Sequence, residues 1–164
     1  MTAVRTLAPG RWQADLDRTT ASFTVGNLGR KAHGTVPVTA GSVEIGPDGS
    51  LLGVRGTLDL SGIATGIPKR DLDLRRPGLL DLDRHPTMRF TASSARAVDE
   101  GWEVTGTLTC RGTAAELTGV VTVDDLVLTA TARLDRRALG IRAPSFLIGR
   151  WVDITVTAAI RHSA

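Results

Sequence analysis

The amino-acid sequence predicts an all-β protein, a single antiparallel barrel of about eight strands with a short helical insert that closes one end. Three observations lead to this prediction. Apolar and polar residues alternate with a period of two over most of the 164 residues, as they do in strands with one buried face. Turn sequences separate the alternating segments. The alternation is lost in one highly charged segment, residues 66–85.

The expected strands follow one another with short links. In chain order they cover ASFTV (21–25), LLGVRGTLDL (51–60), TMRFTASSARAV (87–98), residues 102–110, AELTGVVTV (115–123), residues 126–134 and residues 152–160. The clearest places Trp102, Val104 and Leu108 on an inner face, with Thr105 and Thr107 on an outer one. Such a meander folds as a sandwich or closes into a barrel, and closure removes exposed strand edges.

Residues 66–85 form the expected insert. Asp71 and Arg75 have the i,i+4 spacing that supports a short helix. Pro77-Gly78 then ends the helix, and the residue before Pro86 is pushed towards an extended conformation. We expect the charges to stay in water while the leucines turn towards the barrel, so that the insert acts as a lid.

The composition fits one domain, residues 1–164, with loose tails at residues 1–9 and 161–164. Hydrophobic residues make up 41% and charged residues 23% of the chain, and the net charge is +3. No apolar run approaches the roughly 18 residues that span a bilayer, and the start resembles no secretion signal. We therefore expect a cytoplasmic location and no stable membrane insertion. Cys110 is the single cysteine, which excludes an intrachain disulfide.

The sequence contains no strong catalytic or metal-binding motif. The three histidines are scattered, and no zinc-protease, nucleophile-elbow or phosphate-loop motif occurs. The pairs Asp15/Asp17, Asp71/Asp73 and Asp81/Asp83 could face one side of an extended chain, but one pair supplies too few oxygens for a hard cation. Three Trp, three Phe and no Tyr are too few rings for a nucleic-acid stacking platform. We expect no metal, no enzymatic activity and no nucleic-acid partner.

The segment TGIPKRDLDLRRPGLLDLDRHPTMRF (65–90) resembles the signature of the YceI-like, lipocalin-like family of polyisoprenoid-binding proteins. The matching positions carry no gap: Thr65, Gly66, Arg70, Asp71, Leu74, Arg75, Leu79, Leu80, Asp81, Leu82, Pro86 and Phe90. WQADLDRTTASFTV (12–25), VTGTLTCRGTAAELTGVV (104–121) and LDRRALGI (134–141) are similar to further family segments. The sequence departs from the family pattern at Asp73, where His is usual, and at Leu79, Leu80 and Leu139, where Phe is usual.

The resemblance implies a lipocalin-like barrel that binds an isoprenoid lipid, such as a polyprenyl phosphate or an isoprenoid quinone, for carriage or storage. No cofactor is expected besides this ligand, and a homodimer is left open. The cavity residues that we predict are Phe23, Val25, Leu58, Leu60, Leu72, Leu79, Leu80, Phe90, Trp102, Leu108 and Leu128. The predicted head-group or lid residues are Arg70, Asp71, Arg75 and Arg136. Two alternatives stay open: an enzyme acting on a small hydrophobic substrate in the same cavity, and a filled barrel that serves protein interaction.

Overall fold

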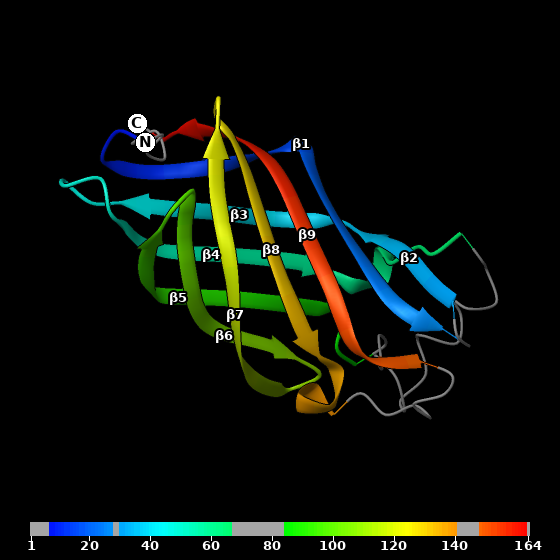
Figure 1. The fold of residues 1–164 in the computed structure, drawn as a ribbon. Coiled ribbons are helices and arrows are strands. Elements are labelled where there is room, and N and C mark those ends of the chain that lie inside the picture. Colours follow the sequence, from blue (N-terminus) through cyan, green and yellow to red (C-terminus); the bar gives the residue numbers. More distant parts are fainter. Residues whose placement is uncertain (1–6, 28–29, 67–83, 141–147, 164) are drawn as a thin grey trace.

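The computed structural model describes residues 7–27, 30–66, 84–140 and 148–163. Within these ranges the chain forms nine antiparallel strands and two short 3-10 helices (Figure 1). The strands are β1 (Gly10–Asn27), β2 (Arg30–Val36), β3 (Val38–Ile45), β4 (Leu51–Asp59), β5 (Thr87–Val98), β6 (Gly101–Cys110), β7 (Thr113–Asp124), β8 (Val127–Asp135) and β9 (Ile148–His162). The 3-10 helices are η1 (Leu60–Gly62) and η2 (Arg136–Leu139).

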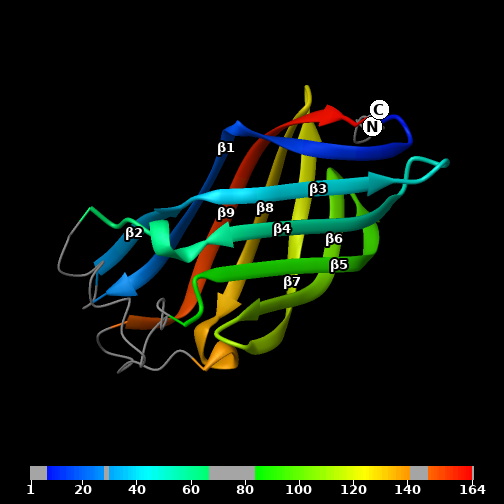
Figure 2. The ribbon, with the colours of Figure 1, turned by 180° about the vertical axis from the view of Figure 1, so that it is seen from behind.

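The sheet closes on itself, which confirms the predicted all-β barrel. Each strand from β3 to β8 pairs with the next strand in the chain, and β9 pairs with β1. Strands β2 and β3 share one place in the wall, because the first half of β1 pairs with β3 and the second half with β2. Pro37 separates the two, and a proline cannot donate to a ladder. The nine strands therefore fill eight places around the barrel (Figures 1 and 2).

The predicted strand faces are confirmed. Trp102, Val104 and Leu108 are buried, whereas Thr107 is exposed. On the outer face, the hydroxyl groups of Thr105 and Thr118 lie 3.0 Å apart on neighbouring strands and form a hydrogen bond. Such cross-strand pairs of threonines stabilise a sheet surface that faces water.

Glycines on the inner face allow the wall to bend. A Cβ atom at Gly106 would overlap the Thr91 carbonyl oxygen and lie 2.6 Å from Ala92 Cβ. A Cβ atom at Gly119 would lie 2.7 Å from the Thr131 carbonyl oxygen. At both places a neighbouring strand comes too close for any side chain, as at the bends of small barrels.

The interior contains two apolar clusters, one towards each end of the barrel. The first, near the chain termini, contains Trp12, Trp102 and Val121. The second contains Leu108, Cys110 and the fully buried Leu139 of η2. Phe90 packs against both clusters.

The described parts of the two tails that were expected to be loose contact the barrel. Leu7 is buried in the first cluster, and Trp12 Nε1 donates a hydrogen bond to the Ala8 carbonyl (2.9 Å). Strand β9 continues to His162, whose ring lies 4.8 Å from that of Trp12. The Ser163 N–H also donates to the Arg11 carbonyl (2.8 Å), so the described residues at the two ends contact each other. Residues 1–6 and 164 lie outside the described residues.

The predicted helical insert, residues 66–85, falls almost wholly outside the described residues, since residues 67–83 are not described. The helical elements of the described chain are η1 and η2. Each begins at an aspartate that caps it: Asp59 accepts a hydrogen bond from the Ser61 N–H (3.0 Å), and Asp135 accepts one from the Arg137 N–H (3.0 Å).

Candidate functional site

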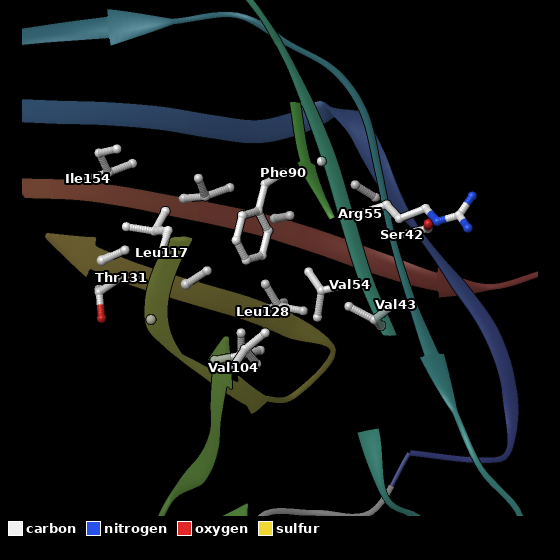
Figure 3. Close-up of a pocket in the computed structure, with 18 of the residues that line it drawn as sticks. Ser42, Val43, Val54, Arg55, Phe90, Val104, Leu117, Leu128, Thr131 and Ile154 are labelled. Atoms are coloured by element: carbon white, nitrogen blue, oxygen red, sulfur yellow. The ribbon is translucent and has the colours of Figure 1, made fainter. Parts of the chain in front are cut away.

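An apolar cavity lies inside the barrel between the two clusters (Figure 3). Its volume is about 170 Å³. The larger apolar side chains of its wall are those of Trp12, Val43, Val54, Leu58, Met88, Phe90, Val104, Leu108, Leu117, Val121, Leu128, Ile154, Val156 and Ile160. All of these are carbon side chains except for the thioether of Met88 and the indole nitrogen of Trp12, which is bonded to the Ala8 carbonyl.

The polar residues at the wall do not direct their side chains into the cavity. Ser42 and Arg55 face each other across β3 and β4, next to the inward pair Val43 and Val54. Because side chains alternate along a strand, both point outwards, and Figure 3 shows the Arg55 guanidinium directed away from the apolar side chains. Thr131 is likewise an exposed residue. Among the described residues the cavity is therefore a site for hydrocarbon.

Small residues create the free space. Ala14, Ala130, Ala132 and Ala158 line the cavity together with Gly56 and Gly119. Gly56 is the clearest case, because a Cβ atom built there would meet nothing within 4 Å. Its cross-strand partner is Phe90, so a glycine lies beside an aromatic ring of the wall.

The cavity volume sets the size of ligand that fits. An apolar cavity of about 150 Å³ stays dry and accepts a benzene molecule. A cavity of about 170 Å³ therefore holds one or two five-carbon units in the described part of the barrel.

The structure distributes the predicted cavity residues over three environments. Leu58, Phe90, Leu108 and Leu128 line the cavity. Trp102 and Leu60 belong to the packed clusters, and Phe23 packs against the second of them. Val25 is half-buried in β1 and does not line the cavity. Leu72, Leu79 and Leu80 lie outside the described residues.

Of the predicted head-group residues, Arg70, Asp71 and Arg75 also lie outside the described residues. Arg136 is described and is only 3% exposed. Its Nε donates a hydrogen bond to the Gly149 carbonyl (2.9 Å). Burial lowers the pKa of this guanidinium, and Arg137 lowers it further by repulsion. Arg136 does not line the cavity; it ties η2 to the start of β9.

Several cavity residues were missed by the sequence analysis. Trp12 and Val43 lie outside the segments that were expected to be strands. Val54 and Met88 lie an even number of residues before Leu58 and Phe90, so the period of two places them on the same inner face. The inward glycines were a further signal. A glycine at an inner position marks either a close backbone approach, as at Gly106, or open space, as at Gly56.

Within the described ranges, no group of three or more His, Cys, Asp or Glu side chains could hold a metal ion. Asp15 Oδ1 instead accepts a hydrogen bond from the Asp17 N–H (3.2 Å). None of the helices in the same ranges has the length and hydropathy needed to cross a bilayer.

A closed antiparallel barrel of eight places around an apolar cavity belongs to the lipocalin-like class of folds. Within that class, the model of the YceI-like domain matches residues 12–160. The chain therefore belongs to the YceI-like family.

Solved structures with the same fold have low sequence identity. Burkholderia cenocepacia BcnA superimposes with a TM-score of 0.77 at 17% identity, covering 90% of this chain and 99% of that chain. A polyisoprenoid binding domain from Saccharophagus degradans, described as implicated in plant cell wall breakdown, has a TM-score of 0.64 at 12% identity and covers 93% and 98%. The Campylobacter jejuni YceI protein has a TM-score of 0.63 at 14% identity and covers 76% and 80%. No curated protein matches the sequence.

Proposed function

We propose that this protein binds an isoprenoid lipid without catalysis and carries or stores it, with the hydrocarbon tail in the barrel cavity. The observation that carries the proposal is the cavity itself, about 170 Å³ enclosed by apolar side chains from eight of the nine strands. Membership of the YceI-like family, and the polyisoprenoid binding ascribed to the Saccharophagus degradans relative, agree with it. A polyprenyl phosphate or an isoprenoid quinone would supply such a tail.

The energetics suit a branched hydrocarbon. Burial of one methylene group contributes about 0.8 kcal/mol, so one five-carbon unit contributes up to about 4 kcal/mol. A value of that size corresponds to about a thousandfold in affinity. Two units in the cavity are thus enough for useful binding even after the cost of immobilising the ligand.

Binding is better supported than catalysis or a filled barrel. General acid–base catalysis needs a titratable group within hydrogen-bond reach of the substrate, and the described cavity wall presents none. An enzymatic role would have to depend on the charges of residues 66–85. A filled barrel, the other alternative, does not account for the open space at Gly56.

A chain-length series tests the proposal. Isoprenoid hydrocarbons of one, two, three and four units are titrated into lipid-free protein by calorimetry. Affinity should rise steeply from one unit to two and then level off, because the described cavity is full at about that size. Affinity that does not depend on chain length would refute binding in the cavity.

The natural ligand is identified separately. Protein purified from its own host is measured by native mass spectrometry before and after solvent extraction. A mass lost on extraction that corresponds to an isoprenoid supports the proposal, and a straight-chain or non-lipid ligand contradicts the isoprenoid assignment.

A further inference from the structure

The barrel wall is interrupted where β1 changes partner. Towards the β2/β3 side, β1 pairs with β3 over Gly10–Gln13 and with β2 only from Ala21 onwards. Towards β9, the register jumps from the Ala14↔Ile160 pair to the Thr19↔Ala158 pair. The four residues Asp15–Arg18 therefore stand outside both ladders and form a large bulge. We call this bulge the arch.

The arch borders a polar pocket on the outside of the barrel, which we call the outer pocket. The volume of the outer pocket is about 430 Å³. Its polar side chains are those of Arg11, Gln13, Asp15, Asp17, Thr39, Ser42 and Arg161. Two hydrogen bonds hold the arch: the Asp17 N–H donates to Asp15 Oδ1 (3.2 Å) and Thr19 Oγ1 donates to the Asp15 carbonyl (2.6 Å).

The outer pocket and the apolar cavity share part of their walls. Ala14 and Ser42 line both. Gly41, which also lines the outer pocket, lies beside Ala14, so that a Cβ atom added to it would be 3.3 Å from Ala14 Cβ. The two spaces thus adjoin at small residues, where the ladder between β1 and β3 ends.

The side chains of the outer pocket combine hydrogen-bond donors and acceptors in equal measure. Arg11 and Arg161 donate, Asp15 and Asp17 accept, and the formal charges cancel. The three ion pairs recorded among the described residues, Arg96–Glu103, Arg133–Asp153 and Arg150–Asp135, involve none of these four side chains. Apart from Asp15 Oδ1, which accepts from the Asp17 N–H, the polar atoms of these four side chains can therefore bond to a ligand.

This combination selects among head groups. A hydroxyl group donates one hydrogen bond and accepts others, so it can pair with a carboxylate and a guanidinium at once. A phosphate at neutral pH mainly accepts hydrogen bonds, and the attraction of Arg11 and Arg161 for its charge is offset by the repulsion of Asp15 and Asp17. It therefore gains no net charge interaction there, although it still has to lose its hydration. The outer pocket therefore favours an uncharged hydroxyl over a phosphate.

We propose that the ligand lies across the barrel wall, with its apolar chain in the cavity and an uncharged hydroxyl end, an alcohol or a phenol, in the outer pocket. The inference rests on the proposed function, since it assumes that the cavity binds the chain. It narrows the head group to an alcohol or to a phenol such as a reduced quinone, in place of a polyprenyl phosphate, and it names the side of the barrel at which that group lies.

The test compares three probes with the same two-unit carbon skeleton: the alcohol geraniol, its monophosphate, and the parent hydrocarbon. Each is titrated into lipid-free wild-type protein by calorimetry. Geraniol should bind about tenfold more tightly than the hydrocarbon, because it gains about one hydrogen bond to a charged group. It should also bind more tightly than the monophosphate.

Three substitutions locate the hydroxyl. Asp15→Asn keeps the acceptor that holds the arch and removes the other carboxylate oxygen, and Arg161→Met keeps the aliphatic stem and removes the donors. Each should abolish most of the advantage of geraniol and leave hydrocarbon affinity unchanged. Arg18→Met is the matched control, because Arg18 belongs to the arch but does not line the outer pocket; it should change neither affinity.

The outcomes separate the two levels of the argument. If the hydrocarbon binds but the monophosphate binds as tightly as geraniol, or Asp15→Asn weakens both ligands equally, the head-group inference is wrong and the proposed function stands. The inference is also overturned if Arg70→Met removes the advantage of geraniol while Asp15→Asn does not. If none of the three probes binds the wild-type protein, the proposed function fails as well.

Discussion

The substitution Gly56→Leu should fill the cavity and at the same time stabilise the protein. Gly56 lies on the inner face of β4 opposite Phe90, and a Cβ atom there meets nothing within 4 Å. Its backbone is not in the left-handed region, so a leucine fits without backbone strain. The new side chain enters the space that the isoprenoid tail would occupy.

The magnitude follows from the cavity volume. An empty cavity costs about 24 cal/mol per Å³, which amounts to about 4 kcal/mol for the 170 Å³ described here. A leucine side chain fills roughly half of that space and should recover about 2 kcal/mol. For a chain of this length such a gain raises Tm by about 4 to 8 °C.

The assay uses lipid-free protein so that a bound lipid does not mask the effect. Thermal unfolding followed by circular dichroism gives the stability, and calorimetric titration with the two-unit hydrocarbon gives the affinity. Gly53→Leu is the matched control, because Gly53 lies on the same strand opposite the exposed Glu44 and faces outwards. It should leave hydrocarbon affinity unchanged.

Two results would refute the reasoning. A large loss of stability in Gly56→Leu would mean that the inner face of β4 is already filled. Unchanged hydrocarbon affinity in a stable Gly56→Leu protein would mean that the ligand binds elsewhere.

Three further outcomes are expected. Phe90→Ala should destabilise the fold by about 3 to 5 kcal/mol in chemical denaturation, because Phe90 packs against both clusters. It should also shift the plateau of the chain-length series to a longer tail. An unchanged plateau would contradict the place of Phe90 in the cavity wall. Gly106→Ala should unfold at a much lower temperature than wild type, since its Cβ atom would overlap a backbone carbonyl, whereas a neutral effect would show that the wall is not bent there. Asp153→Asn should reduce the acid sensitivity of folding, because the hydrogen bond from Arg133 holds the Asp153 pKa below its ordinary 3.8. The carboxylate therefore stabilises the fold above that pH, and its contribution is lost as the pH falls further. An identical acid transition in wild type and variant would show that the pair contributes nothing.

The fold was predictable because alternation is a local property of the chain. Residues such as Trp102 and Thr107 reveal their faces from sequence alone, since a strand with one buried face must alternate. The shared place of β2 and β3, by contrast, depends on which strand lies opposite each half of β1. Pro37 was visible in the sequence, but its effect on the barrel wall became clear only from the pairings.

The cavity was predictable only in part. Alternation shows that Leu60 and Leu128 face inwards but not how far each lies from an end of the barrel, and that position decides whether a residue borders free space. Leu60 belongs to the second cluster and does not line the cavity, whereas Leu128 belongs to the first cluster and lines it. The free space arises because Gly56 has no side chain, and the alternation of apolar and polar residues does not reveal that space.

The single thiol of Cys110 can report how often one end of the barrel opens. Cys110 is 1% exposed in the second cluster, and burial raises its pKa to about 11. A thiol reagent attacks the thiolate, so near neutral pH the folded protein offers neither the reactive species nor a path to it. Modification of the Cys110 thiol therefore requires that end of the barrel to open. The half-life of labelling reports how often it opens, and it can be measured in the unsubstituted protein with and without lipid.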